Sequence, residues 1–415
     1  MATSPSNVQD MSEMFSGMEM LTSLNVSQFY TNKVVDMYQM FYNCKSLVSL
    51  ELSNFRTDNC NGFSQMFRGC EKLEYLDLNN FNTTKAQYMI SMFEGCYNLE
   101  IINGIEKFNT KKVTGSRHMF KDCRKLTNIT LGSMFTLEKE SDLRGIFSGC
   151  IELTSLDLSQ FNIIKAQNME SMFENCSKLS EIKIDTNKFV TNNVISMKNM
   201  FKGCSELSSF NFSGFDTSKV SNMEGMFSSC GYLVSLDLSS FSSNALINMT
   251  QMFYNCTKLE NITFSNNFTL ELIRSMSELF AFDKSLINVN LSNFVTTNNE
   301  NMNSMFEGCS SLISLKLNKF VTNNVITMNK LFKGCSRLIS LEINNFNTEN
   351  VIEMNEMFSG VVNLRELDLT SFDTRNVQSR NGIWDNITEL NVKINITKNY
   401  KILENTPEGI NIVDN

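Results

Sequence analysis

Cysteine is the residue whose spacing in this chain could most readily support chemistry, because 11 of the 12 cysteines recur at one position of a regular pattern. A row of thiols is typical of a disulfide ladder or of a chain of metal sites. Disulfides need Cβ atoms that converge, whereas equivalent residues of stacked repeats point the same way, and the chain lacks the C-x-x-C pairs of zinc sites. The spacing therefore favours buried, reduced thiols that pack as small apolar groups. The row comprises Cys44, Cys70, Cys96, Cys123, Cys150, Cys176, Cys204, Cys230, Cys256, Cys309 and Cys335.

A few polar residues replace apolar ones at positions that should be buried. Asp283 stands at the cysteine position of its repeat, in LFAFDKSL. An unpaired buried carboxylate is costly, so we expect either a locally opened coil or a donor such as Lys284 or a backbone N–H. Glu140 and Asn299 replace an apolar residue at a second position of the repeat. Cys60 occupies the same position in its own repeat and is expected to lie in the core. We interpret the polar replacements as structural irregularities, with a binding site as the alternative.

The single histidine restricts the available catalytic chemistry. His118 lies two residues before Phe120, and we expect it to be exposed. Triads that use a second histidine and all multi-histidine metal sites are excluded. No glycine-rich phosphate loop, nucleophile elbow or H-E-x-x-H motif occurs. The sequence predicts a protein without catalytic residues, metal site or cofactor.

These residues are positioned by an internal repeat. Each unit contains a dipeptide that ends in an aromatic residue, and this aromatic residue is called the anchor below. Ten of the fourteen intervals between anchors are 26 residues, and the others are 27 or 28. Of the 26 methionines, 22 lie one or four residues before an anchor, which makes them core residues. The anchors are Phe15, Phe41, Phe67, Phe93, Phe120, Phe147, Phe173, Phe201, Phe227, Phe253, Phe280, Phe306, Phe332, Phe358 and Trp384.

One repeat, from residue 215 to 241, shows which elements each unit should form. Apolar residues recur at three- and four-residue steps from Val220 to Cys230, which predicts a short helix. Thr217 or Ser218 lies where a helix N-cap would be. The alternation after Leu233 predicts a short strand. Each unit is therefore expected to be a coil of helix, turn, strand and loop.

Stacking such coils predicts an α/β solenoid of about 15 coils, because one coil cannot bury its own helix and strand. Strands of a parallel sheet lie about 4.8 Å apart and packed helices roughly 8–10 Å apart, so we expect a curved array with the parallel sheet on the concave face. We assign residues 1–387 to the solenoid and residues 388–415, where the repeat decays, to a C-terminal capping segment.

Charge and hydropathy restrict the partners. A formal charge of −8 and a pI near 5.1 argue against a nucleic acid or an anionic membrane as the main partner. No apolar run approaches the roughly 18 residues of a spanning helix, and MATSPSNVQDMSEMF lacks the features of a signal peptide. The first repeat begins without a polar cap, so a partner or a preceding domain is expected at the N-terminal end.

The repeat also resembles a known family. The run L-x-x-L-x-L, as in LVSLDL from Leu233 and LRELDL from Leu364, is similar to the core of leucine-rich repeats. The whole unit, MFxGCxxLxxLxLSxFxTxxVxxM, resembles the BspA-type leucine-rich repeat of bacterial surface proteins and some protist proteins. The resemblance covers nearly the full chain. It implies an α/β solenoid displayed at a cell surface or secreted, which acts in adhesion or protein binding and carries no catalytic residues.

The predicted partner-binding surface is the row of residues between the two apolar positions of each strand. Six of its fourteen members are acidic and two are basic, which suits a mildly cationic or polar partner such as a protein or an extracellular matrix component of a host. A solvated sheet without a partner is the alternative. A second function, an intracellular scaffold in a larger cytoplasmic assembly, also fits the missing signal peptide. The charged members are Glu51, Asp77, Asp157, Lys183, Asp237, Lys316, Glu342 and Asp368, and the others are Asn25, Asn103, Thr130, Asn211, Thr263 and Asn290.

Overall fold

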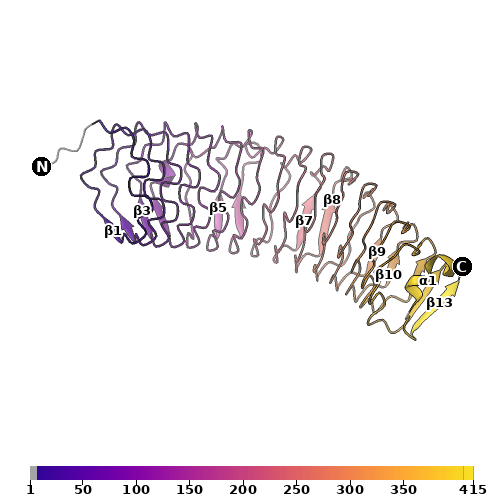
Figure 1. The fold of residues 1–415 in the computed structure, drawn as a ribbon. Helices are drawn as coiled ribbons and strands as arrows, with labels where there is room; N and C mark the ends of the chain where they lie inside the picture. The colour runs from indigo at the N-terminus through magenta and orange to yellow at the C-terminus, as the bar shows by residue number, and fades with distance from the viewer. Residues whose placement is uncertain (1–6, 405, 415) are drawn as a thin grey trace. The chain divides into compact units, whose positions relative to one another are not determined.

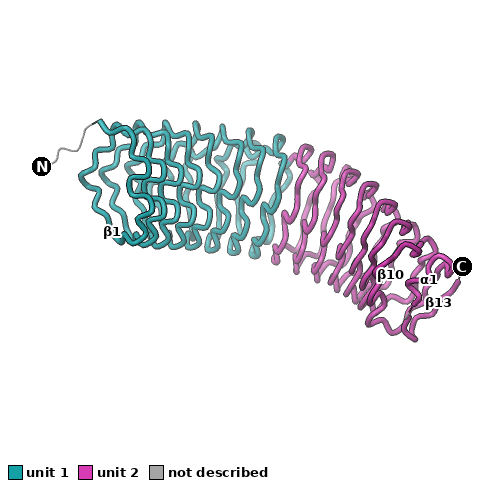
Figure 2. Tube along the Cα trace, in the orientation of Figure 1, with its two compact units in different colours: residues 1–215 teal, residues 216–415 magenta. Residues whose placement is uncertain are grey.

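The fold is a β-solenoid of about 14 turns with parallel strands. The computed structural model describes residues 7–404 and 406–414, so the outermost residues of both predicted domains lie outside the described part. The chain divides into two compact units, Met1–Phe215 and Asp216–Asn415 (Figure 2). Each unit is a stack of similar coils, and the coils that contain a short strand carry it on the same side (Figure 1). Every coil therefore depends on its neighbours for its core and its hydrogen bonds.

Unit 1 contains six short strands, and all of their pairings are parallel. Strands β1 to β4 form one sheet in chain order, and β5 pairs with β6. Each pairing joins equivalent residues of successive coils, such as Leu50 with Leu76. The elements are β1 (Ser23–Leu24), β2 (Ser49–Leu50), β3 (Tyr75–Asp77), β4 (Ile101–Asn103), the 3-10 helix η1 (Ile105–Lys107), β5 (Ser155–Asp157) and β6 (Glu181–Lys183).

Unit 2 follows the same plan and ends in a different segment. β7 pairs with β8, β9 with β10, and β11, β12 and β13 form a three-stranded parallel sheet. The elements are β7 (Ser235–Leu238), β8 (Asn261–Phe264), β9 (Ser314–Lys316), β10 (Ser340–Glu342), β11 (Glu366–Leu369), β12 (Leu390–Ile394), α1 (Ile396–Leu403) and β13 (Ile410–Asp414).

The predicted helix of each repeat is wrong, because a succession of turns takes its place. In the coil of Phe41, the N–H of Cys44 donates to Phe41 O at 3.2 Å, three residues back, whereas the N–H of Phe41 donates to Met66 O of the next coil at 2.9 Å. Gln39 and Asn43 have φ of 53° and 54°. Positive φ at the third residue of a turn matches type II geometry and cannot continue a right-handed helix. All fifteen anchors have positive φ two residues before and two residues after them.

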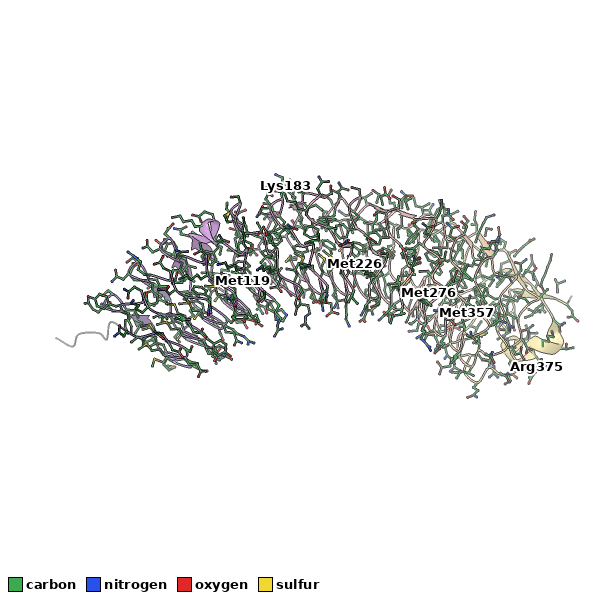
Figure 3. The ribbon with its side chains drawn as sticks, turned by 90° about the horizontal axis from the view of Figure 1, so that it is seen from above. Met119, Lys183, Met226, Met276, Met357 and Arg375 are labelled. Atoms are coloured by element: carbon green, nitrogen blue, oxygen red, sulfur yellow. The ribbon has the colours of Figure 1, made fainter. Side chains whose placement is uncertain are left out.

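The turns still bury the residues that a helix would have buried. The methionines one and four residues before the anchor, the anchor ring and the cysteine are buried in the coil of Phe41, where Met37, Met40, Phe41 and Cys44 are 0% exposed. Met14 of the first coil is an exception, at 47% exposed. Anchor rings stack between successive coils, with centroids 5.7 Å apart for Phe41 and Phe67. Figure 3 shows Met119 and Met226 inside their units and Lys183 at the surface. The core composition was therefore predicted although the backbone conformation was not.

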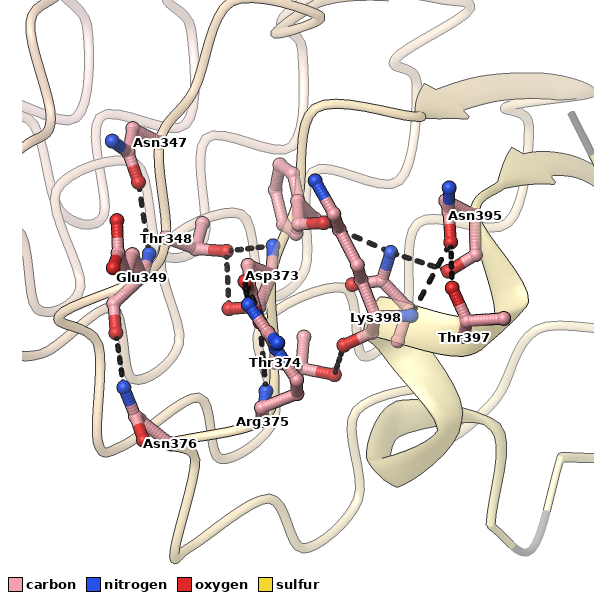
Figure 4. A network of polar contacts seen from close by, with 12 residues as sticks. Asn347, Thr348, Glu349, Asp373, Thr374, Arg375, Asn376, Asn395, Thr397 and Lys398 are labelled. Atoms are coloured by element: carbon pink, nitrogen blue, oxygen red, sulfur yellow. Dashed lines mark hydrogen bonds and ion pairs between the residues drawn. The ribbon is translucent and has the colours of Figure 1, made fainter.

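A row of buried threonines links the coils at a second corner. Thr217, predicted to cap a helix, instead donates from Oγ1 to Ser242 O and accepts from Ser242 N–H in the next coil, both at 2.8 Å. Thr348 makes the same pair of bonds to Asp373, at 2.9 and 2.8 Å (Figure 4). One hydroxyl thus satisfies both backbone groups of the neighbouring residue. Members of the row that are at most 2% exposed are Thr31, Thr57, Thr83, Thr110, Thr191, Thr217, Thr296, Thr322, Thr348 and Thr374.

The segment after the last anchor forms β12, α1 and β13. Helix α1 begins after Asn395, whose side chain accepts from Lys398 N–H. The indole Nε1 of Trp384 donates to Ile402 O at 2.9 Å and so fixes α1 to the last repeat. We propose that this segment caps the repeat core, in agreement with its predicted role, because it covers the last anchor with a helix instead of another coil.

Candidate functional site

The cysteine row is a packing feature with a hydrogen bond of its own. All 12 cysteines are buried and none forms a disulfide. The thiol of Cys70 donates to Phe41 O at 3.1 Å, the carbonyl that also accepts from Cys44 N–H. The small size and weak donor of cysteine suit this position. Burial raises the pKa of the thiols to about 12 for Cys96 and Cys335, so the nucleophilic thiolate is not formed near neutral pH.

This burial predicts slow thiol chemistry in the folded protein. We expect the native protein to react with a disulfide reagent such as dithionitrobenzoate at pH 8 only on the time scale of unfolding, because neither access nor thiolate is available. Denaturation with guanidinium should release all 12 thiols for reaction. Absorbance of the released thiophenolate measures both rates. Rapid labelling of several native thiols would contradict the packing role.

Asp283 is fully buried at the cysteine position, and a backbone N–H is its donor. Its Oδ1 accepts from Cys256 N–H at 2.7 Å, as one of the two predicted arrangements requires. Its Oδ2 has no hydrogen-bond partner among the described residues. Burial raises the pKa of this carboxyl well above its usual value, opposed by the Cys256 amide. Burial therefore favours the neutral form of Asp283.

The other two polar replacements are also buried and find local partners. Glu140 accepts from Ser141 N–H and Asp142 N–H, both at 2.9 Å, and burial raises its pKa. The amide of Asn299, with its nitrogen facing Asn301 O, can donate to that oxygen and accept from Met276 N–H, both at 3.3 Å. Glu140 satisfies the backbone of its own turn, and Asn299 also reaches the preceding coil through Met276 N–H, so both are irregularities in the core.

His118 is half-buried, so its predicted exposure is wrong. It lies two residues before its anchor and has a φ of 59°. Its imidazole lies against Gly145 of the next coil. Burial lowers the pKa of the imidazole, opposed by the charge of Glu94. The neutral form dominates near pH 7.

The predicted strand row of unit 1 lies on the strands or directly after them, except at Thr130 and Asn211, where the structure forms no strand. Asp77 and Asn103 pair across β3 and β4, which fixes the register of the 27-residue repeat. Asp157 pairs with Lys183 across β5 and β6, and Lys183 also lies 3.5 Å from Glu181. Glu51, immediately after β2, is exposed. Acidic residues in this unit are thus partly balanced by a neighbouring lysine.

Unit 2 continues the row with a similar balance of charge. Lys316 and Glu342 pair across β9 and β10 and form an ion pair of 2.9 Å. Asp368 pairs with Lys393 of β12. Asp237 of β7 is exposed.

Most acidic members of the strand row also have a structural task. Asp237 Oδ1 accepts from Ser239 N–H at 2.9 Å, and Asp368 Oδ1 accepts from Thr370 N–H at 3.0 Å. Asn25 makes the same bond to Ser27 at 3.0 Å. These bonds close the turn after each strand, and Ser239 lowers the pKa of Asp237. Asparagine replaces aspartate at this position without losing the bond.

A hollow of about 600 Å³ opens on the strand side of unit 2, over β10 to β13. Ile339 and Val413 at its border are 61% and 49% exposed. Arg365, Asp368 and Lys393 supply charges around these apolar groups. Sequence reasoning identified only Asp368 here, because Lys393 and Val413 follow the last anchor. The alternation of residues 390–394, continued in register, was the signal that could have found Lys393.

Residues 7–404 and 406–414 contain no group of three or more His, Cys, Asp or Glu arranged to hold a metal ion. Within the same ranges, no helix has the length and apolar character needed to cross a membrane.

Comparison with solved structures finds leucine-rich-repeat proteins of bacteria. A leucine-rich-repeat protein from Bacteroides ovatus is 19% identical, with 86% of this chain and 91% of that chain covered and a TM-score of 0.45. A leucine-rich cell surface protein from Faecalibacterium prausnitzii is 17% identical, with 80% and 75% covered and a TM-score of 0.37. The functional domain of InlJ from Listeria monocytogenes, which includes a cysteine ladder, is 16% identical, with 91% and 74% covered and a TM-score of 0.22. No curated protein matches the sequence.

The family comparison covers nearly the whole chain. DUF285, described as a Mycoplasma protein of unknown function, matches residues 9–132, 89–209, 178–281, 260–340 and 300–407. The resemblance to BspA-type leucine-rich repeats inferred from the sequence is confirmed. The chain belongs to the DUF285 family.

Proposed function

We propose that this protein is a non-enzymatic recognition and adhesion solenoid of the cell surface, which holds a partner protein or an extracellular matrix component against its strand side. The observation that carries the proposal is the hollow over β10 to β13, where the exposed side chains of Ile339 and Val413 are surrounded by Arg365, Asp368 and Lys393. Exposed apolar side chains beside charged ones are a usual composition of a protein interface.

The chemistry of the described residues supports a binding function over catalysis. The thiols are buried with raised pKa values, and Asp283 is buried in the core. The single histidine is half-buried in a turn. The acidic residues of the strand row mostly close turns, which leaves the hollow as the better candidate for energetic contacts.

A double variant tests the hollow. Ile339→Ser with Asp368→Asn removes an exposed apolar group and one charge, while asparagine keeps the bond to Thr370. We expect beads coated with this variant to adhere about ten-fold more weakly to purified extracellular matrix proteins than beads coated with the unaltered protein. Flow detachment measures the difference.

The matched control alters the same unit away from the strand side. Ile326 is 43% exposed, so Ile326→Ser with Glu349→Gln makes an equivalent change in apolar surface and charge. This control should adhere normally. Equal adhesion of both variants would exclude the hollow, and an absence of adhesion by the unaltered protein would overturn the adhesion function. Surface labelling of intact native cells tests the location. If the protein carries no label and is recovered only from the cytosol, an intracellular scaffold is favoured.

A further inference from the structure

A row of lysines occupies one corner of unit 1, eight residues before each anchor. Four successive coils carry an exposed lysine there: Lys85, Lys112, Lys139 and Lys165. In unit 2 the same position is asparagine in four successive coils: Asn298, Asn324, Asn350 and Asn376. This position follows the strand row by eight or nine residues, beyond the turn that closes the strand, so the two rows are separate surfaces.

Asparagine at this position stabilises the stack. Asn350 Nδ2 donates to Asn323 O at 2.8 Å, in the preceding coil. In unit 1, Asn59 and Asn193 make the same bond, at 2.9 Å, to Asn32 O and Ile164 O. Lysine has no short side-chain amide that could donate the same hydrogen bond. The coils of the lysine row therefore lack the hydrogen bond to the preceding coil that asparagine makes at this position in other coils.

The lysine row also departs from the charge pattern of the other rows. Several other charges of unit 1 pair with an opposite charge of the neighbouring coil, as for Lys45 with Glu19 at 2.7 Å and Lys178 with Glu152 at 2.5 Å. Lys85 contacts only an amide, Asn59 Oδ1, at 2.7 Å. Coils lie about 4.8 Å apart, and like charges at that separation are destabilising.

The other three lysines, Lys112, Lys139 and Lys165, form no ion pair within the part of the chain that the structure describes. Lys111 adds a further exposed cation beside the row, and the half-buried Glu138 is the acidic neighbour of Lys139. Four cations in line span roughly 15 Å. This arrangement costs stability and leaves its charge available to a ligand.

Neutral hydrogen-bonding groups accompany the lysines. The position two residues after each lysine is exposed, and is filled by Gln87, Thr114, Ser141 and Gln167. Tyr88, beside the first of these, is 47% exposed. A line of cations next to a line of amide and hydroxyl groups suits a linear ligand with both charges and hydroxyls, and a tyrosine ring can pack against a sugar ring.

We propose that this corner of unit 1 binds a linear anionic polysaccharide, sulfated or carboxylated, that runs across the coils along the lysine row. A single strand of nucleic acid would call for several aromatic rings on which successive bases stack, whereas the row carries one tyrosine. A membrane would call for basic groups spread over a plane, whereas these lie in one line. The site is independent of the proposed function of the strand side.

The test replaces lysine by the residue that the repeat uses elsewhere. The variant Lys112→Asn/Lys139→Asn/Lys165→Asn should bind a size-defined heparin oligosaccharide at least about ten-fold more weakly than the unaltered full chain in isothermal titration. The slope of log K against log salt should decrease in magnitude by about 2 to 3. The melting temperature should rise, because the new amides restore the bonds between coils and the repulsion is removed. A loss of binding in this variant therefore cannot come from unfolding.

The control Lys45→Gln/Lys178→Gln/Lys202→Gln removes the same net charge from paired lysines of unit 1 and should change heparin affinity less than about two-fold. Equal losses in both variants, or no heparin binding by the unaltered protein at low salt, would overturn the proposal. Oligo(dT) and phosphatidylserine vesicles serve as the competing ligands. If either binds as tightly as heparin and with the same loss in the asparagine variant, the assignment to a polysaccharide is wrong.

Discussion

Replacing Asp283 by cysteine is expected to raise the free energy of unfolding by about 3 kcal/mol at pH 7. Folding must transfer the carboxyl into the core, where its Oδ2 finds no partner among the described residues. Burial favours the protonated carboxyl, and holding it protonated costs about 1.4 kcal/mol for each pH unit by which the solution lies above the unfolded pKa of about 3.9. The bond from Cys256 N–H returns part of this cost. Cysteine fits the same position in the neighbouring coils, as Cys256 and Cys309 show.

The dependence of this effect on pH follows from the direction of the pKa shift. The pKa of Asp283 is raised in the folded state, so above pH 4 the unfolded state loses its proton first. The unaltered protein therefore loses stability as pH rises from about 4 towards the raised pKa, and the advantage of Asp283→Cys grows over that window. Guanidinium unfolding at pH 5 and pH 7, followed by circular dichroism, measures the change.

Asp283→Asn separates the charge from the polar packing. Asparagine keeps an oxygen for Cys256 N–H but cannot ionise, so this variant should lose the pH dependence. Its gain should be smaller than that of cysteine, because a buried amide still lacks partners. A gain for cysteine that is the same at pH 5 and pH 7 would mean that Asp283 is charged in the folded protein.

The core could be predicted from the sequence because side-chain hydrophobicity reports burial directly. Methionine, phenylalanine and cysteine positions repeat at fixed distances, and their side chains fill the interior as expected. The strands could be predicted for the same reason, because alternation determines which residues face outward. Asn103 and Lys183 lie in the predicted row, on β4 and β6.

The turns could not be predicted from hydrophobicity, because three- and four-residue spacing fits both a helix and two successive turns. A signal was present two residues after the anchors, where Gly69, Gly95 and Asn43 recur in the sequence. Glycine and asparagine adopt positive φ at low cost, and Gly69 has a φ of 73°. Such residues at a fixed position within an apparent helix indicate turns.

The candidate surfaces were only partly predictable for a related reason. A row of exposed residues is visible in the sequence once the register is known, but its role depends on neighbours in the next coil. Asp237 appears as a free charge in the sequence and closes a turn in the structure. Lys393 lies opposite Asp368 across β11 and β12 although no anchor follows it. The contact between coils, rather than the repeat itself, decides which charge remains available.

Thr348→Val is expected to lower the free energy of unfolding by about 3 kcal/mol. Valine preserves the shape of the side chain but removes the hydroxyl that donates to Asp373 O and accepts from Asp373 N–H. Thr348 is 0% exposed, so water cannot replace the hydroxyl at that point of the core. Each backbone group left unpaired costs about 1 to 3 kcal/mol. Because each coil contacts only its neighbours, we expect the loss to appear as opening of the coils around Asp373.

Thr348→Ser provides the control, because serine keeps the hydroxyl and removes only a buried methyl group, at a cost of about 1 kcal/mol. Serine already occupies this row at Ser243, where it accepts from Thr269 N–H at 2.9 Å. Urea unfolding should order the variants as threonine, serine and valine, from most to least stable. Hydrogen exchange of the Asp373 amide should be faster in Thr348→Val alone. If serine destabilises as much as valine, packing of the methyl group holds the coils together at this corner, and the hydroxyl is incidental.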